Sequence, residues 1–365
     1  MALQNRGLMV RRHPGDDGPL PQKTPLLLQM EDIPMPAAGP GEAVIKMERV
    51  GICGSDVHYW QHGYIGDFIV GESCLMGHES AGVVHEVGDG VTNVKVGDRV
   101  AIEPGVPCRR CFHCKTGHYN LCPDMAFCAT PPIHGNCSTY YKHAADFLFK
   151  LPDHVTSEQA ALLEPLSVGV HACGRAGVAM GSNVLIMGAG PIGLVCLLVA
   201  KASGAATVTI VDLIEQRLEM AKKLGADFCI TSSTSETPEQ LAARIEKTVG
   251  HQADQTTECT GAAPCVSTAI YGTRSGGTVV LVGLGRPKVE IPIVNASVRE
   301  VDIRGIFRYC NAYPVALQLV ASGKITAEQL DLFVTHRYKL ADAATAFETT
   351  LNAVQTNSIK VMIEC

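Results

Sequence analysis

The pattern of hydrophobic and polar positions changes character near residue 156. Before that point, short runs of apolar residues interleaved with polar ones predict strands, and Gly, Pro and Asp-Gly pairs separate them. These runs cover 43–51, 80–88 and 98–104. A long excursion over 103–140 has little strand pattern and carries a cluster of cysteines. The pattern therefore predicts an all-β region over residues 1–150.

After residue 156, predicted strands alternate with predicted helices. Residues 156–177 have helical spacing, and Thr156 followed by Gln159 predicts a capping box at its start. Strand-like runs follow at 184–188, 207–212, 227–230, 254–258 and 278–284, with helical runs at 214–225, 237–250 and 263–274. This alternation predicts a parallel sheet with helices on both faces. Two more helices are predicted at 314–323 and 341–352. The fold class is therefore α/β.

Composition narrows the class of protein. The chain has 365 residues, 46% of them hydrophobic and 18% charged, which is typical of a globular protein with two domains. The net charge is −6 and no basic tail or stripe is present, so neither nucleic acid nor an anionic membrane is an expected partner. The longest apolar stretch, 192–200, is about half of what a bilayer span needs.

Fifteen cysteines raise the alternative of a secreted, disulfide-linked protein. That alternative fits poorly, because the count is odd, the chain is long and no apolar signal region begins it. A mitochondrial transit peptide is disfavoured because Arg11 and Arg12 are soon followed by Asp16 and Asp17. We therefore expect a cytoplasmic protein whose cysteines bind metal or fill apolar positions.

A nucleotide-binding motif follows the strand at 184–188. Gly188, Gly190 and Gly193 form the G-x-G-x-x-G pattern, which allows close approach of a pyrophosphate to a helix N-terminus. Asp212 ends the next strand, where a carboxylate can bind the ribose hydroxyls of NAD and repel the 2′-phosphate of NADP. Arg217 either flanks the adenosine ribose or lies on a solvated helix. The motif predicts NAD as cofactor.

The excursion over 103–140 contains a pattern typical of a structural zinc site. Its cysteines have the spacing C-x2-C-x2-C-x7-C and are Cys108, Cys111, Cys114 and Cys122. Four thiolates at this spacing bind Zn2+ and order a loop that has no core of its own. The alternatives are an iron–sulfur cluster, which the longer last gap disfavours, and four unligated thiols. A zinc ribbon that binds nucleic acid would need more basic residues nearby.

A second zinc site is predicted from Cys53, His78 and Glu79. Thiolate, imidazole and carboxylate all bind zinc, and three protein ligands leave a fourth position open, as in catalytic sites. Taken singly, these residues would be a buried Cys, a hydrogen-bonded His and a helix-capping Glu. The two other motifs make the catalytic site the favoured interpretation. Asp56 is predicted to accept a hydrogen bond from His78 and so fix its ring.

Three further residues are candidates for proton transfer. Glu164 is a carboxylate in an otherwise apolar helix and therefore needs a partner. It either hydrogen-bonds the zinc water or binds the metal directly. Ser55 and His58 follow Cys53 closely, and such a pair beside a metal-bound alcohol can carry its proton to solvent.

Many segments of 40–365 together resemble the zinc-dependent medium-chain dehydrogenase/reductase superfamily, in its polyol-dehydrogenase branch. They are GICGSDVHYW, GHES, YNLCPDMAFCATPP, LLEPLSVGVHAC, GAGPIG, ECTG, TRSGGTVVLVGLG and REVDIRGIFRYCN. The resemblance implies a GroES-like, mostly-β catalytic domain over 1–162, with a structural-zinc loop at 103–125. It also implies a Rossmann domain over 163–300 and a return to the catalytic domain over 301–365. Members of this family are commonly tetramers, so a homotetramer is expected.

The resemblance also implies residue roles. Cys53, His78 and Glu79 would bind the catalytic zinc, with Glu164 near its water and the substrate. The polyol would contact Tyr59, Phe127, Thr130, Glu164, Arg308 and Tyr309. NAD would contact Ile192, Asp212, Arg217, Val282, Gly283, Leu284, Ile306, Phe307 and Arg308. Animal members of the branch often lack the four structural cysteines, whereas this chain keeps them.

The expected reaction is NAD-dependent and zinc-dependent oxidation of polyols such as sorbitol, xylitol and L-iditol at C2 to the ketose, together with the reverse reduction. Sorbitol would give fructose. The alternative is a related zinc dehydrogenase for xylitol, L-arabinitol, threonine or a simple alcohol. A non-enzymatic descendant of the fold would be expected to lack a zinc ligand or to have a broken glycine motif, and this chain keeps both.

Overall fold

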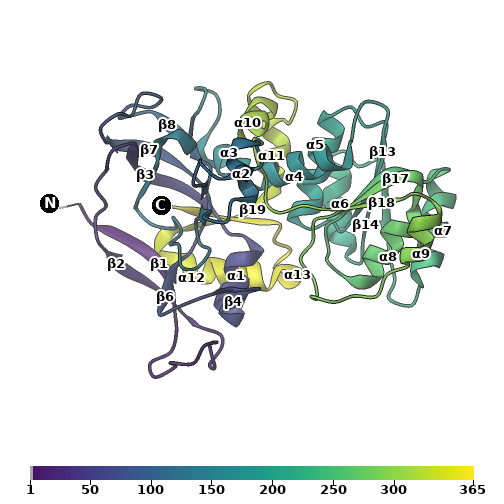
Figure 1. Cartoon of the computed structure of the whole chain (residues 1–365), viewed down its shortest axis with the longest axis horizontal. Coiled ribbons are helices and arrows are strands. Elements are labelled where there is room, and N and C mark those ends of the chain that lie inside the picture. The colour runs from purple at the N-terminus through teal and green to yellow at the C-terminus, as the bar shows by residue number, and fades with distance from the viewer. Residues whose placement is uncertain (1–2) are drawn as a thin grey trace. The chain divides into compact units, whose positions relative to one another are not determined.

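The protein consists of two compact units. The computed structural model describes residues 3–365. One unit contains Met1–Glu164 and Phe333–Cys365, and the other contains Pro165–Leu332. The first unit is thus built from two stretches that lie far apart in the sequence. Its yellow elements from the later stretch lie among the purple and blue elements of the earlier one (Figure 1).

The first unit is mostly β. Its strands are β1 (Asn5–Arg11), β2 (Leu27–Ile33), β3 (Glu42–Gly51), β4 (Tyr64–Ile65), β5 (Phe68–Ile69), β6 (Ser73–Leu75), β7 (Glu79–Val87), β8 (Arg99–Ile102), β9 (Gly105–Val106), β10 (Ala126–Phe127), β11 (Tyr140–Ala144), β12 (Leu148–Lys150), β19 (Val334–Lys339) and β20 (Lys360–Glu364). Its helices are α1 (Gly54–His62), α2 (Phe112–Lys115), α3 (Ser157–Ala161), α12 (Ala343–Leu351) and α13 (Ala353–Thr356), with 3-10 turns η1 (Tyr119–Leu121), η2 (Ala145–Phe147) and η3 (Leu340–Asp342).

A seven-stranded sheet organises this unit. Its order is β12-β8-β7-β3-β20-β19, with β11 also paired to β3. The inward side chains of β3, among them Ile45 and Met47, are fully buried in a core that also contains Phe347 of α12. The alternation of apolar and polar residues in the sequence predicted these central strands correctly. It did not predict that β1 and β2 pair over their whole length beside β6.

The second unit is a doubly wound α/β domain. Its strands are β13 (Asn183–Met187), β14 (Thr207–Asp212), β15 (Phe228–Thr231), β16 (Ala253–Glu258), β17 (Thr273–Leu281) and β18 (Asp302–Gly305). Its helices are α4 (Leu163–Ala176, from the end of the first unit), α5 (Pro191–Ala202), α6 (Glu215–Lys223), α7 (Pro238–Val249), α8 (Ala263–Gly272), α9 (Ile293–Val298), α10 (Tyr313–Ala321) and α11 (Ala327–Phe333). All pairings are parallel, in the order β15-β14-β13-β16-β17-β18, which is the Rossmann order.

The second unit extends further along the chain than the family resemblance implies. The prediction returns the chain to the first domain at 301, whereas the structure does so at Phe333. The physical reason is β18, which pairs in parallel with β17 and so completes the Rossmann sheet. The first boundary lies after Glu164 rather than after 162.

The helical segment predicted at 156–177 is two helices. Thr156 caps α3 as predicted: its Oγ1 accepts from the amide of Gln159 at 3.2 Å, and Gln159 Oε1 accepts from the Thr156 amide at 3.0 Å. The helix then breaks at Leu162 before α4 begins. Within residues 3–365, no helix has both the length and the apolar character that a membrane span requires.

Candidate active site

The side chains of Cys53, His78 and Glu79 meet in the first unit. Cys53 is the N-cap of α1, and Glu79 is the first residue of β7. One ligand atom from each of the three lies within 4.8 Å of the others. His78 and Glu79 are buried, and Cys53 is partly exposed.

The pairing of β3 with β7 brings these residues together. Gly51, the last residue of β3, lies opposite Glu79 across the ladder. A Cβ atom at position 51 would overlap Oε2 of Glu79, so the absence of a side chain there gives the carboxylate its space. The short connection from Gly51 to α1 then places Cys53 beside the same carboxylate.

Asp56 holds the backbone of this cluster. Its Oδ2 accepts from the amide of Cys53 at 3.1 Å, and its Oδ1 accepts from the amide of Gly77 at 3.2 Å. Oδ1 also lies 3.4 Å from Nδ1 of His78, but the two atoms form no hydrogen bond, in contrast to the prediction. The Asp56 carboxylate therefore fixes the backbone at Cys53 and Gly77 and does not fix the imidazole ring of His78.

The surroundings of Cys53, His78 and Glu79 attract a positive charge. Burial alone lowers the pKa of His78, but the neighbouring Asp56 and Cys53 outweigh burial and raise it well above its ordinary value. Nδ1 of His78 is a buried polar atom without a hydrogen-bond partner. A buried set of thiolate, imidazole and carboxylate donors that attracts a cation fits Zn2+.

Lys360, which no sequence motif marked, lies in β20 and contacts the same cluster. Its Nζ is 2.6 Å from both carboxylate oxygens of Glu79, and it donates to the carbonyl of Ile52 at 3.0 Å. Burial lowers the pKa of Lys360, but Glu79 and Cys53 outweigh it and the pKa is raised. The sequence feature that could have identified Lys360 is its position inside the apolar run 359–363.

Two other buried carboxylates lie in the first unit. Glu164 is in the first turn of α4, where the helix dipole favours negative charge. Glu103 follows β8, and its Oε1 accepts from the Tyr119 hydroxyl at 2.6 Å. Burial raises the pKa of Glu103 to about 7, with a further contribution from the Glu164 charge. No sequence motif marked Glu103 as a candidate.

Ser55 and His58 both lie on α1. They are three residues apart, a spacing that places them on one face of a helix. His58 is exposed and stacks on His62, with the ring centroids 4.3 Å apart. Burial and the neighbouring His62 lower the pKa of His58. The proton-relay role of this pair stays a prediction.

The four cysteines of the 103–125 loop also meet. Their Sγ atoms lie within 4.8 Å of one another. The amide of Cys108 donates to Sγ of Cys122 at 3.3 Å, and the amide of Cys111 donates to Sγ of Cys108 at 3.4 Å. Hydrogen bonds from the Arg110 and Cys111 amides lower the pKa of Cys108 to about 7. These hydrogen bonds stabilise the Cys108 thiolate, whereas burial raises the pKa of Cys114 to about 12 and also raises that of Cys122. Bound Zn2+ would stabilise the thiolate form of all four.

The glycine motif has the geometry of a dinucleotide site. Gly188 follows β13, Gly190 caps α5, and a Cβ at Gly193 would overlap the Gly188 carbonyl. Asp212 ends β14, and its Oδ2 accepts from the amide of Ala189 at 2.7 Å. Nη1 of Arg217 lies 4.0 Å from the same oxygen. The carboxylate therefore lies directly beside the phosphate-binding loop.

Comparison with known proteins identifies the family. Residues 39–153 match the alcohol dehydrogenase GroES-like domain, and residues 191–322 match the zinc-binding dehydrogenase family. The chain is 56% identical to sorbitol dehydrogenase from Gallus gallus over an alignment of 338 residues. This alignment covers 93% of each chain. The chain belongs to the sorbitol dehydrogenase family. The resemblance to the polyol branch of the superfamily and the α/β fold class are thereby confirmed.

Solved structures agree with this membership. The fold is similar to 2R,3R-butanediol dehydrogenase from Bacillus subtilis, with a TM-score of 0.84, 31% identity and 99% of both chains covered. It is also similar to a short chain alcohol dehydrogenase from E. coli complexed with NADH, with a TM-score of 0.86, 26% identity and 100% of both chains covered.

The polyol contacts implied by the family lie on both units. In the first unit, the Phe127 ring is tilted against His78 with centroids 5.8 Å apart, and Thr130 donates its amide to the Phe127 carbonyl at 3.1 Å. Tyr59 is buried in the main core. In the second unit, Tyr309 is buried against Tyr313, with ring centroids 5.7 Å apart. These substrate roles remain predictions.

The NAD contacts implied by the family lie in the second unit. Arg308 has a positive φ of 52°, and its guanidinium lies 4.7 Å from the centroid of the Phe307 ring. Phe307 and Leu284 are exposed. Ile192 lies in the first turn of α5, and the remaining implied contacts are Val282, Gly283 and Ile306. Their roles also remain predictions.

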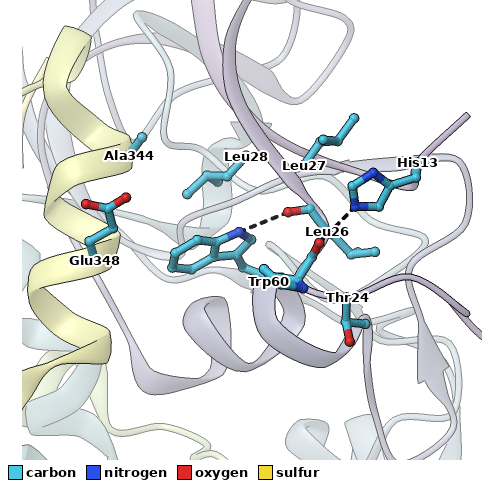
Figure 2. Close-up of a pocket in the computed structure, with 9 residues that line it drawn as sticks. His13, Thr24, Leu26, Leu27, Leu28, Trp60, Ala344 and Glu348 are labelled. Atoms are coloured by element: carbon cyan, nitrogen blue, oxygen red, sulfur yellow. Dashed lines mark hydrogen bonds between the residues drawn. The ribbon is translucent and has the colours of Figure 1, made fainter.

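The first unit also contains a pocket of about 400 Å3 that is separate from the cluster of Cys53, His78 and Glu79. Figure 2 shows His13, Trp60 and Glu348 around it, with the Trp60 indole donating to the Leu26 carbonyl at 3.0 Å. None of the three cluster residues lines this pocket. It is therefore separate from the candidate active site.

We predict that Glu103→Gln makes the first unit less sensitive to pH. A carboxyl whose pKa is raised from 4.5 to about 7 stabilises the fold fully below pH 4.5, and this stabilisation is lost as pH rises through 7. Between pH 4.5 and 8, the wild type should lose about 3 kcal/mol of unfolding free energy relative to the variant. Urea unfolding followed by fluorescence of Trp60, the single tryptophan, measures this unit.

Glu86→Gln is the matched control for this prediction, because Glu86 lies exposed on β7 of the same sheet. This control should keep the wild-type pH dependence. Parallel curves for the wild type and Glu103→Gln at all pH values would contradict the prediction.

Proposed function

We propose that the chain is an NAD-dependent zinc polyol dehydrogenase that oxidises sorbitol, xylitol or L-iditol at C2 and catalyses the reverse reduction. The observation that carries the proposal is the cluster of Cys53, His78 and Glu79. It occurs in a chain 56% identical to a sorbitol dehydrogenase. We assign the catalytic zinc to these three residues, which leave one of four tetrahedral positions open.

The reaction divides between the bound groups and the protein. When bound, zinc supplies a Lewis acid that polarises the reacting oxygen, and NAD accepts the hydride. The protein holds and moves the proton. We assign Glu164 as a buried carboxylate that orients or accepts it. The lowered pKa of His58 keeps its exposed imidazole neutral near pH 7, so it can accept a proton and release it to solvent.

The second unit supplies the dinucleotide site. Gly188, Gly190 and Gly193 let the pyrophosphate approach the N-terminus of α5. The Asp212 carboxylate suits ribose hydroxyls and repels a 2′-phosphate, so we infer NAD rather than NADP. The structure of an E. coli relative with bound NADH supports a nicotinamide cofactor for this fold.

The four-cysteine cluster is proposed to bind a second, structural zinc. The loop that carries it has only short elements of its own, and Arg109 ties it to Asp146 with guanidinium–carboxylate distances of 2.6 and 2.8 Å. Both zinc sites need reduced thiolates, so a reducing compartment such as the cytoplasm suits the protein.

The substrate assignment is tested by NADH absorbance with purified protein. Sorbitol, xylitol, L-arabinitol, 2,3-butanediol, threonine and ethanol are offered in turn, with NAD and then NADP. NADH formation from sorbitol or xylitol, with at least about tenfold preference for NAD, is the expected result. Activity confined to threonine, ethanol or butanediol would assign the chain to another zinc dehydrogenase, and silence with every substrate would overturn the enzymatic proposal.

Glu164→Gln is predicted to lower turnover about 100-fold, because the amide cannot take up a proton. NAD binding, measured by fluorescence titration with NADH, should be unchanged. Glu158→Gln on neighbouring α3 is the control, since Glu158 pairs with Arg337 and lies outside the cluster. Wild-type turnover in Glu164→Gln would remove this residue from the mechanism.

We further propose that the protein is a homotetramer. Supporting this, a run of large apolar side chains is exposed around α9: Val289, Ile293, Val294 and Val298, with exposed fractions of 42, 54, 70 and 76%. Contiguous exposed apolar surface commonly marks a protein interface.

Replacing Val294 and Val298 with Asp should therefore shift the assembly to a smaller species, measured by light scattering after size exclusion. Val96→Asp, at a 59% exposed valine of the first unit, is the control and should keep the wild-type mass. An unchanged mass in the double variant would exclude this surface as the interface.

A further inference from the structure

Lys360 is a buried cation that donates to three acceptor atoms. Its side chain is 3% exposed, and that of Glu79 is 1% exposed. Both Glu79 oxygens lie 2.6 Å from Nζ, and the Ile52 carbonyl accepts at 3.0 Å. An ammonium group has three protons to donate, so these three acceptors satisfy it. Lysine is almost never buried unless it is paired in this way.

Strand pairing fixes the position of this lysine. β20 pairs with β3, with Met362 opposite Gly51, and the amide of Ile52 donates to the carbonyl of Val361 at 2.9 Å. The ammonium group is thereby brought to the end of β3, where the chain turns toward Cys53. The contact with Glu79 is set by the sheet and not by a flexible surface side chain.

The charges around this lysine are unbalanced without it. One ligand atom each from Cys53, His78 and Glu79 lies within 4.8 Å of the others, and Oδ1 of Asp56 lies 3.4 Å from Nδ1 of His78. Glu79 and Asp56 are both buried, with exposed fractions of 1%. Buried like charges repel strongly in a medium of low dielectric constant. Lys360 supplies the opposite charge to the Glu79 carboxylate, which has almost no access to water.

We propose that Lys360 is a positioning residue of the catalytic metal centre: it anchors the Glu79 carboxylate beside Cys53 and His78 and balances its charge when no metal is bound. The proposal rests on the zinc site of the proposed function. Lys360 and a bound metal would compete for the Glu79 carboxylate, so the lysine would stabilise the cluster before zinc binds and weaken the hold of Glu79 on zinc.

The test compares Lys360→Met, Lys360→Arg and the double variant Lys360→Met/Glu79→Gln with the wild type. Zinc affinity is measured by chelator competition, and thermal unfolding of zinc-stripped and zinc-loaded protein is followed by Trp60 fluorescence. Cys53→Ala, which lacks one of the three ligands, gives the zinc signal of the four-cysteine site alone.

Lys360→Met removes the charge but keeps an unbranched apolar stem of similar length. The melting temperature of its metal-free form should lie about 5 °C or more below that of metal-free wild type. The melting temperature of its zinc-loaded form should fall by less than half as much relative to zinc-loaded wild type. Its zinc dissociation constant should fall about tenfold or more, because Glu79 is released to the metal. The double variant should recover metal-free stability relative to Lys360→Met, since the unpaired carboxylate is gone.

Lys360→Arg retains a positive charge and should lie closer to the wild type than Lys360→Met in both measurements. The proposal would be overturned if Lys360→Met lost the same stability in its metal-free and zinc-loaded forms and its zinc affinity stayed within about twofold of the wild type. Lys360 would then be an ordinary core residue. Failure of Lys360→Met to fold even with zinc would overturn it likewise. Wild-type protein that binds zinc only at the four cysteines would instead overturn the proposed function itself.

Discussion

The antiparallel pairing of β3 with β7 is the constraint on which the candidate active site depends. It sets Glu79 opposite Gly51, and the missing side chain of Gly51 leaves space for the carboxylate over the end of β3. The same strand end leads through Ile52 to Cys53 and pairs with β20, which carries Lys360. One stretch of sheet therefore positions two of the three ligands and their buried counter-charge.

The buried carboxylates of the first unit each have a different neighbour. Both oxygens of Glu79 accept hydrogen bonds from Lys360, whereas Glu103 accepts from a tyrosine hydroxyl and burial raises its pKa to about 7. Glu164 lies at a helix N-terminus, which favours negative charge. The raised pKa of Glu103 allows this carboxyl to exchange a proton near neutral pH.

Much of this arrangement could be predicted from local sequence. The Rossmann strands and helices were found because each buries a distinct apolar pattern, and Thr156 and Gln159 predicted their capping box from spacing alone. The ligand residues were found because short motifs carry them. Lys360 was missed because its partner Glu79 lies far away in the sequence, and no local pattern records their pairing. Likewise, the boundary implied at 300 left β18 outside the second unit, and the four residues of this edge strand carry too little periodic signal to correct it.

The distance between Glu79 and Lys360 along the chain is 281 residues, and it has a consequence for biosynthesis. During translation, β3 and β7 are made long before β20, so the part of β3 at Arg49–Gly51 waits without its neighbour while the whole second unit is synthesised. An unpaired strand edge is a template for pairing with another chain. The nascent protein therefore passes through a stage in which this edge and the negatively charged cluster beside it are both uncovered, and chaperone binding at that stage would act on β3.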